Sequence, residues 1–210
     1  GSDPEANPRL RTAIDAAKAV NMPAANIDRA VKKGAGETDG AAYEEVTYEG
    51  YGPGGVAVFL ECLTDNKNRT VAEIRHIFTK CNGSRGENGS VAWMFDKLGV
   101  VTVPAANTTE DDLMMIVLDA GAEDIAQEDD VFLVKSDVAS LEAVKAALEE
   151  NGVEYTTAEL TREPQNTVDV EGKQAEQVLK MMDMLEDNDD VQNLYSNFDI
   201  DDSVIEALNA

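Results

Sequence analysis

The sequence predicts an α+β protein with three domains: a helical domain at residues 1–40 and two α/β sandwiches of ferredoxin-like type, one inserted in the other. Apolar residues recur at helical spacing near the start, and strand and helix patterns follow one another from about residue 41 onward. Residues 98–163 have the order β-α-β-β-α-β. The α/β elements on either side of them are too few for two further domains. We therefore expect residues 41–97 plus 164–210 to form one discontinuous domain.

Two short helices are expected in the first domain, over residues 7–20 and 24–33. Asn7 is a suitable N-cap, and Pro8 suits the first position of a helix. Gly34 is a residue type that commonly ends a helix. Two helices of this length bury little apolar surface, so we expect the helical domain to be incomplete at its N-terminus or to dock on the residues that follow.

The discontinuous domain is expected to have strands and helices in both segments. Alternating β-branched, aromatic and aliphatic residues predict the strands, and the spacing of Val71, Ile74 and Ile77 predicts a helix. The predicted strands are 43–50, 54–63, 90–96, 166–170 and 191–199, and the predicted helices are 68–81, 172–188 and a short one at the C-terminus.

Gly50, Gly52 and Gly55 match the G-x-G-x-x-G pattern of dinucleotide-binding loops. Such a loop joins a strand to a helix, so that the pyrophosphate meets the helix N-terminus. Here both flanking segments have strand patterns, and Pro53 lacks an amide donor. We therefore interpret these glycines as a hairpin connection and expect no nucleotide site.

The inserted domain has the most regular alternation of strand and helix patterns. Thr109, with Asp112 three residues later, is typical of a helix start, and Gly152 suits a helix end. The predicted strands are 99–104, 123–129, 131–136 and 153–161, and the predicted helices are 109–121 and 137–152.

Charge is distributed unevenly along the chain. The net charge is −25, from 17 basic and 42 acidic residues. Residues 1–97 hold twelve basic and fourteen acidic residues, whereas residues 98–210 hold five and twenty-eight. An acidic surface repels phosphate backbones, so we expect any contact with nucleic acid to come from residues 1–97.

Other features argue against several classes of function. The sequence has no long apolar run and no secretory signal, so we expect a cytoplasmic protein without a membrane partner. Cys62 and Cys81 lack metal-ligand spacing, and His76 is the only histidine. The acidic clusters, such as 110–112 and 187–190, are interpreted as solvated turns and helix starts. We expect no enzymatic activity, no cofactor, no metal ion and no small-molecule substrate.

Three long stretches together resemble one protein family. They are DPEANPRLRTAIDAAKAVNMP with the following VKKGAG, YEEVTYEGYGPGGVAVFLECLTDNKNRTVAEIRHIF, and KMMDMLEDNDDVQNLYSNFDI. They resemble the YebC/PmpR family of transcriptional regulators, which includes the mitochondrial translational activator of cytochrome c oxidase subunit I. The resemblance covers essentially the whole chain. It implies one helical and two α/β domains, and a basic, lysine-rich segment before the first stretch.

The resemblance implies a role with nucleic acids that involves no catalysis. We expect a regulator of gene expression that binds DNA in transcription, with a translation factor that binds ribosomal RNA or the ribosome as the alternative. A protein-interaction module is a second alternative, because methionines form adaptable partner surfaces, although helical spacing also fits a core role. These methionines are Met114, Met115, Met181, Met182 and Met184.

Basic residues of the N-terminal half are the candidate nucleic-acid contacts. Phosphate binding requires several cations on one surface, and no aromatic-rich strand suggests base stacking. The first group is Arg9, Arg11, Lys18, Arg29, Lys32 and Lys33, on the two short helices. The second group is Lys67, Arg69, Arg75, Lys80 and Arg85, on or beside the 68–81 helix.

Overall fold

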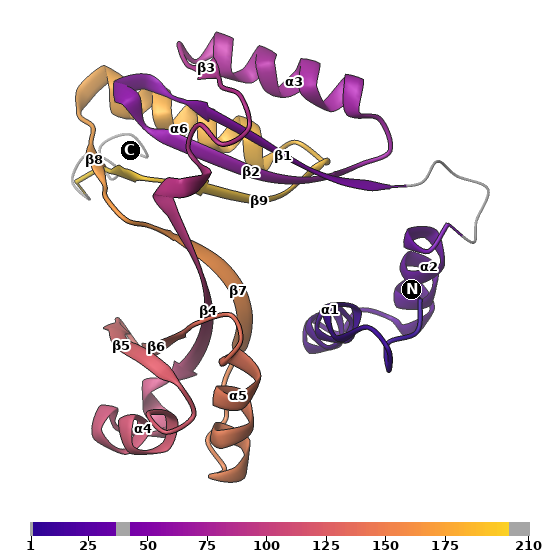
Figure 1. The fold of residues 1–210 in the computed structure, drawn as a ribbon, viewed down its shortest axis with the longest axis vertical. Helices are drawn as coiled ribbons and strands as arrows, with labels where there is room; N and C mark the ends of the chain where they lie inside the picture. The colour runs from indigo at the N-terminus through magenta and orange to yellow at the C-terminus, as the bar shows by residue number, and fades with distance from the viewer. Residues whose placement is uncertain (1, 37–42, 202–210) are drawn as a thin grey trace. The chain divides into compact units, whose positions relative to one another are not determined.

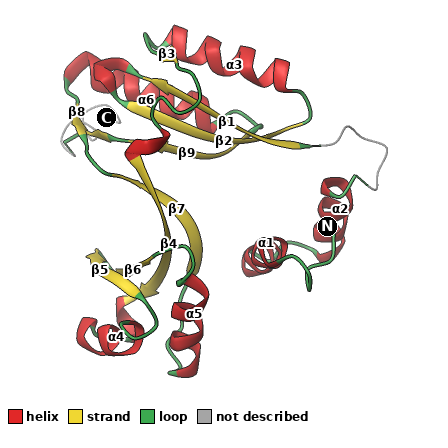
Figure 2. Cartoon of the chain, viewed as in Figure 1, coloured by secondary structure: helices red, strands yellow, loops and turns green. Residues whose placement is uncertain are grey.

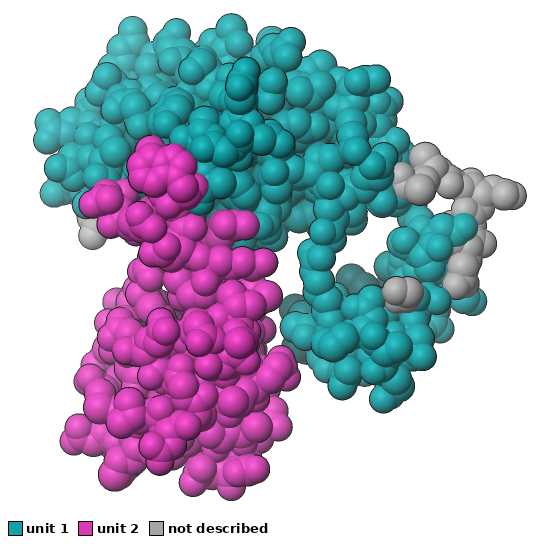
Figure 3. Space-filling view, in the orientation of Figure 1, with its two compact units in different colours: residues 1–92, 167–210 teal, residues 93–166 magenta. Residues whose placement is uncertain are grey.

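The computed structural model describes residues 2–36 and 43–201 (Figure 1). Within these ranges the fold is mixed α+β, with six α-helices and two four-stranded antiparallel sheets. Contacts divide the chain into two compact units, Gly1–Ala92 with Thr167–Ala210, and Trp93–Asn166 (Figure 3). The division into three domains stays a prediction, and the predicted limit between residues 97 and 98 lies inside one strand. The predicted C-terminal helix lies outside the described residues.

The two N-terminal helices form as expected. Helix α1 spans Pro8–Ala19, and the Asn7 side chain accepts a hydrogen bond from the Leu10 amide, as an N-cap does. Helix α2 spans Ala24–Gly34. No residue of α1 is buried, and Ile27 is the buried residue of α2, so this pair contributes little to a core.

A β-hairpin begins the first α/β sheet. Strands β1 (Glu44–Tyr51) and β2 (Ala57–Thr64) pair in antiparallel register, with Tyr51 opposite Ala57. The connection contains Gly54 and Gly55, at φ of +73° and +82°, values that favour glycine. The interpretation of the glycine motif as a hairpin is confirmed.

This sheet has the strand order β3-β1-β2-β9, with helices α3 and α6 packed on the same core (Figure 2). The core includes Leu60 of β2, Phe78 of α3 and Met181 of α6. The bounds are Lys67–Lys80 for α3, Ser84–Arg85 for β3, Gly172–Glu186 for α6 and Val191–Ser196 for β9. Chain segments before and after the second unit therefore build one sheet and one core.

Two predicted strands differ from the structure. The prediction of a strand over 90–96 is wrong, because a 3-10 turn covers Ala92–Met94 and strand β4 begins only at Phe95. The predicted strand over 191–199 is interrupted at Asn197, whose side chain accepts a hydrogen bond from the Ala57 amide at 2.7 Å. Beyond it, β10 (Phe198–Asp199) pairs in parallel with β8 (Val168–Asp169).

The second unit has the predicted β-α-β-β-α-β order. Its sheet order is β5-β6-β4-β7, with all neighbours antiparallel. Leu113 of α4 and Leu148 of α5 pack with Val101 of β4 in the core. The bounds are Phe95–Pro104 for β4, Glu110–Val117 for α4, Ala122–Glu128 for β5, Val131–Ser136 for β6, Leu141–Glu150 for α5 and Thr157–Pro164 for β7.

Candidate nucleic-acid interface

The first group of candidate cations is exposed on α1 and α2. On α1, Arg9 forms an ion pair with Glu45 at 2.9 Å, and Lys18 forms one with Asp15 at 3.4 Å. Arg11 donates a hydrogen bond to the backbone carbonyl of Glu5. These contacts are solvent-exposed, so each contributes little energy and leaves the cations accessible.

The last turns of α2 carry the most compact set of cations. Arg29, Lys32 and Lys33 are exposed at positions i, i+3 and i+4. In the part of the chain that the structure describes, none of the three forms an ion pair with a carboxylate. The Lys33 Nζ lies 5.2 Å from the centroid of the Tyr43 ring, and hydrogen bonding to Tyr43 raises the pKa of Lys33. This turn therefore presents three charged side chains that can meet an anion.

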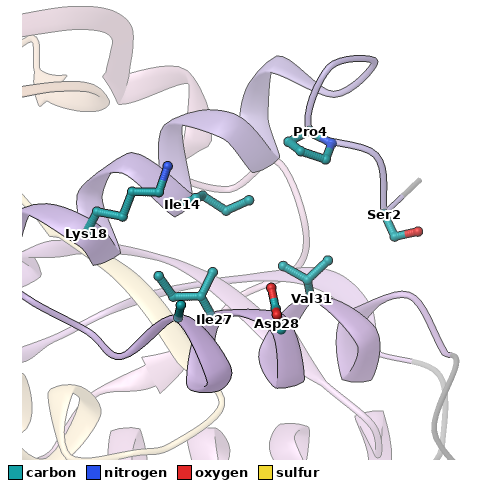
Figure 4. A pocket seen from close by; sticks show the side chains of 8 residues that line it. Ser2, Pro4, Ile14, Lys18, Ile27, Asp28 and Val31 are labelled. Carbon is teal, nitrogen blue, oxygen red and sulfur yellow. The ribbon is translucent and has the colours of Figure 1, made fainter.

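A pocket of about 220 Å³ lies between the two helices (Figure 4). Ile14, Ile27 and Val31 give it an apolar wall, while Lys18 and Asp28 also line it. The pocket forms because two short helices do not pack completely against each other. Arg29, Lys32 and Lys33 do not line it.

The second group of cations is not assembled into one face. Two residues of α3 that lie eleven positions apart, Arg69 and Lys80, are only about 20° apart around the helix axis, whereas Arg75 is about 120° from Arg69. Lys67 forms an ion pair with Glu44. Arg85 is half-buried on β3, where it pairs with Gly50 of β1. Arg75 and Lys80 remain exposed on separate sides of α3.

Arg69 belongs to a polar network that connects distant parts of the chain. Its Nη2 donates to both oxygens of Asp190 at 2.9 Å, and also to Asp65 at 3.0 Å. The Asp190 carboxylate is buried and accepts further hydrogen bonds from Thr70 and Thr64. Burial opposes its charged form, but these donors outweigh burial and lower the pKa of Asp190. This geometry gives Arg69 a structural partner 121 residues away.

The network corrects the interpretation of residues 187–190 as a solvated turn. Asp190 is only 7% exposed and is the acceptor on which the network converges. Sequence reasoning missed it because its neighbours in the chain are polar and its partners come from distant elements, Arg69 and Thr70 from α3 and Thr64 from the end of β2. A single polar residue before a strand carries no local signal of burial.

A second buried carboxylate, Glu49 of β1, was also missed. It is 2% exposed and accepts hydrogen bonds from the amides of Gly89, Val91 and Ala92 at 2.6–2.8 Å. These amides are therefore bound to a side chain rather than to a neighbouring strand, which explains why residues 90–94 do not continue β4.

Potential metal ligands, the two thiols and the hydropathy of the helices complete the description of these residues. No group of three or more His, Cys, Asp or Glu side chains within residues 2–36 and 43–201 is placed to hold a metal ion. Cys62 and Cys81 are buried free thiols, and burial followed by the charge of Asp190 raises the pKa of Cys62 to about 12. Among the same residues, no helix has the length and apolar character required to cross a membrane.

The described residues therefore form an α+β protein with two antiparallel four-stranded sheets and a compact set of exposed cations on α2. Residues 1–37 match the model of the TACO1/YebC N-terminal domain, and residues 43–198 match that of the TACO1/YebC second and third domain. The chain belongs to the TACO1/YebC family.

Relatives and a solved structure support this assignment. Proteins of Desulfatibacillum aliphaticivorans and Geobacter sulfurreducens, each named a probable transcriptional regulatory protein, are 58% and 54% identical to the chain. The matches cover 98% and 99% of this chain and 83% and 84% of the relatives. A crystal structure of a conserved hypothetical protein from Aquifex aeolicus aligns with a TM-score of 0.85 at 46% identity, over 96% of this chain and 83% of that one.

Proposed function

We propose that the protein is a non-enzymatic regulator of gene expression that binds nucleic acid, with DNA as its target in transcription. The observation that carries the proposal is the exposed set of Arg29, Lys32 and Lys33 on α2, which has no carboxylate partner in the described ranges. The relatives named as transcriptional regulators support a role in gene expression. The proposed activity requires no cofactor, metal ion or small-molecule substrate.

Local charge makes this binding feasible despite the net charge of −25. Screening at physiological salt limits exposed charges to a range of about 8 Å, so a phosphate near α2 experiences the local cations more than the distant acidic residues. The cations lie on one face of a helix and offer no aromatic platform. We therefore expect contacts with the phosphate backbone and weak sequence preference.

The proposal is tested by titrating the full chain with duplex DNA in gel-shift assays at two salt concentrations. Each phosphate neutralised on duplex DNA contributes a slope of about −0.9 in log K against log salt. Replacing Arg29, Lys32 and Lys33 by Gln should weaken binding and reduce the salt slope by up to about three. The matched control replaces Lys97, Lys145 and Lys173 by Gln and should leave both quantities unchanged.

Cosedimentation with ribosomes, with and without nuclease, distinguishes the alternative target. The protein would instead be a translation factor if it binds ribosomes in a salt-sensitive way through the α2 cations and does not bind DNA. No salt-sensitive binding to DNA, RNA or ribosomes would contradict the function altogether.

A further inference from the structure

Helix α4 carries exposed apolar side chains that the proposed function does not use. Met115 is 72% exposed, Met114 is 45% exposed, and Leu118, which directly follows the helix, is 63% exposed. They are three of the eight large apolar residues found exposed in the described ranges, and they lie within five consecutive positions. Such a concentration of apolar surface is typical of a contact site.

These side chains are not required for the core of the second unit. Leu113 and Val117 already occupy the inner face of α4, where they are 0% and 1% exposed. On the outer face, Met114 and Leu118 are four positions apart, and Met115 is three positions before Leu118. The three therefore form one stripe on the side of α4 that faces away from the core.

The segment that carries this stripe is strongly acidic. Residues 98–134 contain nine acidic residues and no lysine, arginine or histidine. Asp111 lies in the first turn of α4, at the position i−4 from Met115, and Asp119 directly follows Leu118. Elsewhere in this unit, Lys135 and Lys145 already form ion pairs with Glu163 and Glu142. The stripe is therefore flanked by carboxylates in a segment, residues 98–134, that has no basic residue of its own.

We propose that this surface of Met114, Met115 and Leu118, with its acidic rim, binds a cationic amphipathic segment of a partner protein. Apolar residues of the partner would cover the stripe, and lysines or arginines would lie against the rim. Flexible methionines adapt to such partners. Nucleic acid would be repelled by the acidic rim, and so would a second copy of this acidic surface.

The site lies in the second unit, apart in sequence from the α2 cations, so the two proposals fail or succeed independently. The probe is a fluorescently labelled 18-residue peptide of leucine and lysine that places its leucines on one helical face. A peptide of the same composition with its leucines distributed around the helix is the control. Anisotropy titrations of the full chain should show salt-sensitive binding of the first peptide and at least about tenfold weaker binding of the second.

Substitutions in the full chain then locate the site. Replacing Met115 and Leu118 by Gln should weaken peptide binding at least about tenfold, because burial of each apolar side chain contributes about that factor or more. Asp111→Asn should weaken binding less and reduce its salt dependence. Leu160→Gln removes an apolar side chain of similar exposure, 42%, from β7 and should leave binding unchanged.

Circular dichroism of each variant establishes that the fold is retained, as expected for outer-face substitutions. Equal peptide affinity of the original protein and the Met115→Gln, Leu118→Gln variant would overturn the proposal. Concentration-dependent dimers in sedimentation velocity that this variant abolishes would also overturn it, because the occupant would then be a second copy of the chain.

Discussion

Asp190 is a buried carboxylate whose charge is stabilised by donors from α3. Its oxygens accept hydrogen bonds from Arg69 and Thr70 at 2.9 and 2.7 Å. Loss of the charge leaves these donors with a weaker acceptor at a largely buried position. The network therefore connects the segment before β9 to α3 and makes the stability of this core depend on pH.

Asp190→Asn should lower the free energy of unfolding by about 1–3 kcal/mol at pH 7, as measured by urea denaturation. Since the folded-state pKa of Asp190 is lowered, its contribution is complete above the unfolded pKa of about 3.9 and is lost as pH falls below that value. The difference between the two proteins should therefore shrink toward pH 3.

Asp65→Asn is the matched control, because Asp65 binds the same Arg69 from the surface. It should cost less than about 1 kcal/mol at pH 7. If the two variants lower the free energy of unfolding equally, burial of Asp190 does not determine how much the network stabilises the protein.

The sequence shows a run of acidic residues here but does not indicate which of them is buried. Asp187, Asn188, Asp189 and Asp190 are similar in local pattern, yet Asp190 alone among them is buried. The same holds for the candidate cations: Arg69 and Lys80 lie on one helix, yet Arg69 binds the buried Asp190 whereas Lys80 is exposed. Burial depends on which distant segment covers a side chain, and local pattern does not contain that information.

The contact of β1 with α3 and β3 requires a residue without a side chain at position 50. A Cβ atom added to Gly50 would lie 2.5 Å from the Phe78 ring and 2.6 Å from the backbone oxygen of Ser84. A backbone atom cannot move aside as a flexible side chain can. The glycine therefore permits close packing of these elements, a role that its place in the G-x-G-x-x-G pattern did not reveal.

Gly50→Ala should lower the urea midpoint and speed amide exchange in β1, with a cost of about 1–3 kcal/mol from overpacking. Gly34→Ala is the control, because nothing lies within 4 Å of the added Cβ and α2 tolerates alanine. That variant should leave exchange in β1 unchanged. A Gly50→Ala protein of unaltered stability would argue against the close approach.

Most helices and strands could be predicted because their patterns are local. Helix α3 lies within one residue of its prediction at both ends, and β6 matches its prediction at both ends. The predictions failed where a backbone amide binds a side chain instead of a neighbouring strand. The Glu49 carboxylate accepts from amides before β4, and the Asn197 side chain accepts from the Ala57 amide where the last strand is interrupted. Strand propensity does not indicate which hydrogen-bond partner an amide will find.

The described residues, 2–36 and 43–201, form two hydrophobic cores. One includes Leu60, Phe78 and Met181, and the other includes Val101 and Leu148. Each core belongs to one of the two compact units. Since apolar packing energy acts only over contact distance, a cavity in one core should leave the other largely unaffected.

Leu148→Ala should destabilise the second unit by about 2–5 kcal/mol, because Leu148 is fully buried. Hydrogen exchange followed by mass spectrometry should show faster exchange in peptides from 98–163, with peptides from the first sheet retaining their protection. Leu60→Ala, equally buried in the first unit, should give the reverse pattern. If either variant accelerates exchange equally in both units, the two cores unfold as one.

The sequence by itself determined the type and order of most elements, the family resemblance and the uneven distribution of charge. These follow from local periodicity and composition, which need no knowledge of distant contacts. The tertiary structure alone decided that Glu49 and Asp190 are buried acceptors, that Arg69 is engaged while the α2 cations stay accessible, and that Met114 and Met115 are exposed while Met181 is core. The physical reason is that burial and pairing depend on segments far apart in the chain, such as Arg69 and Asp190.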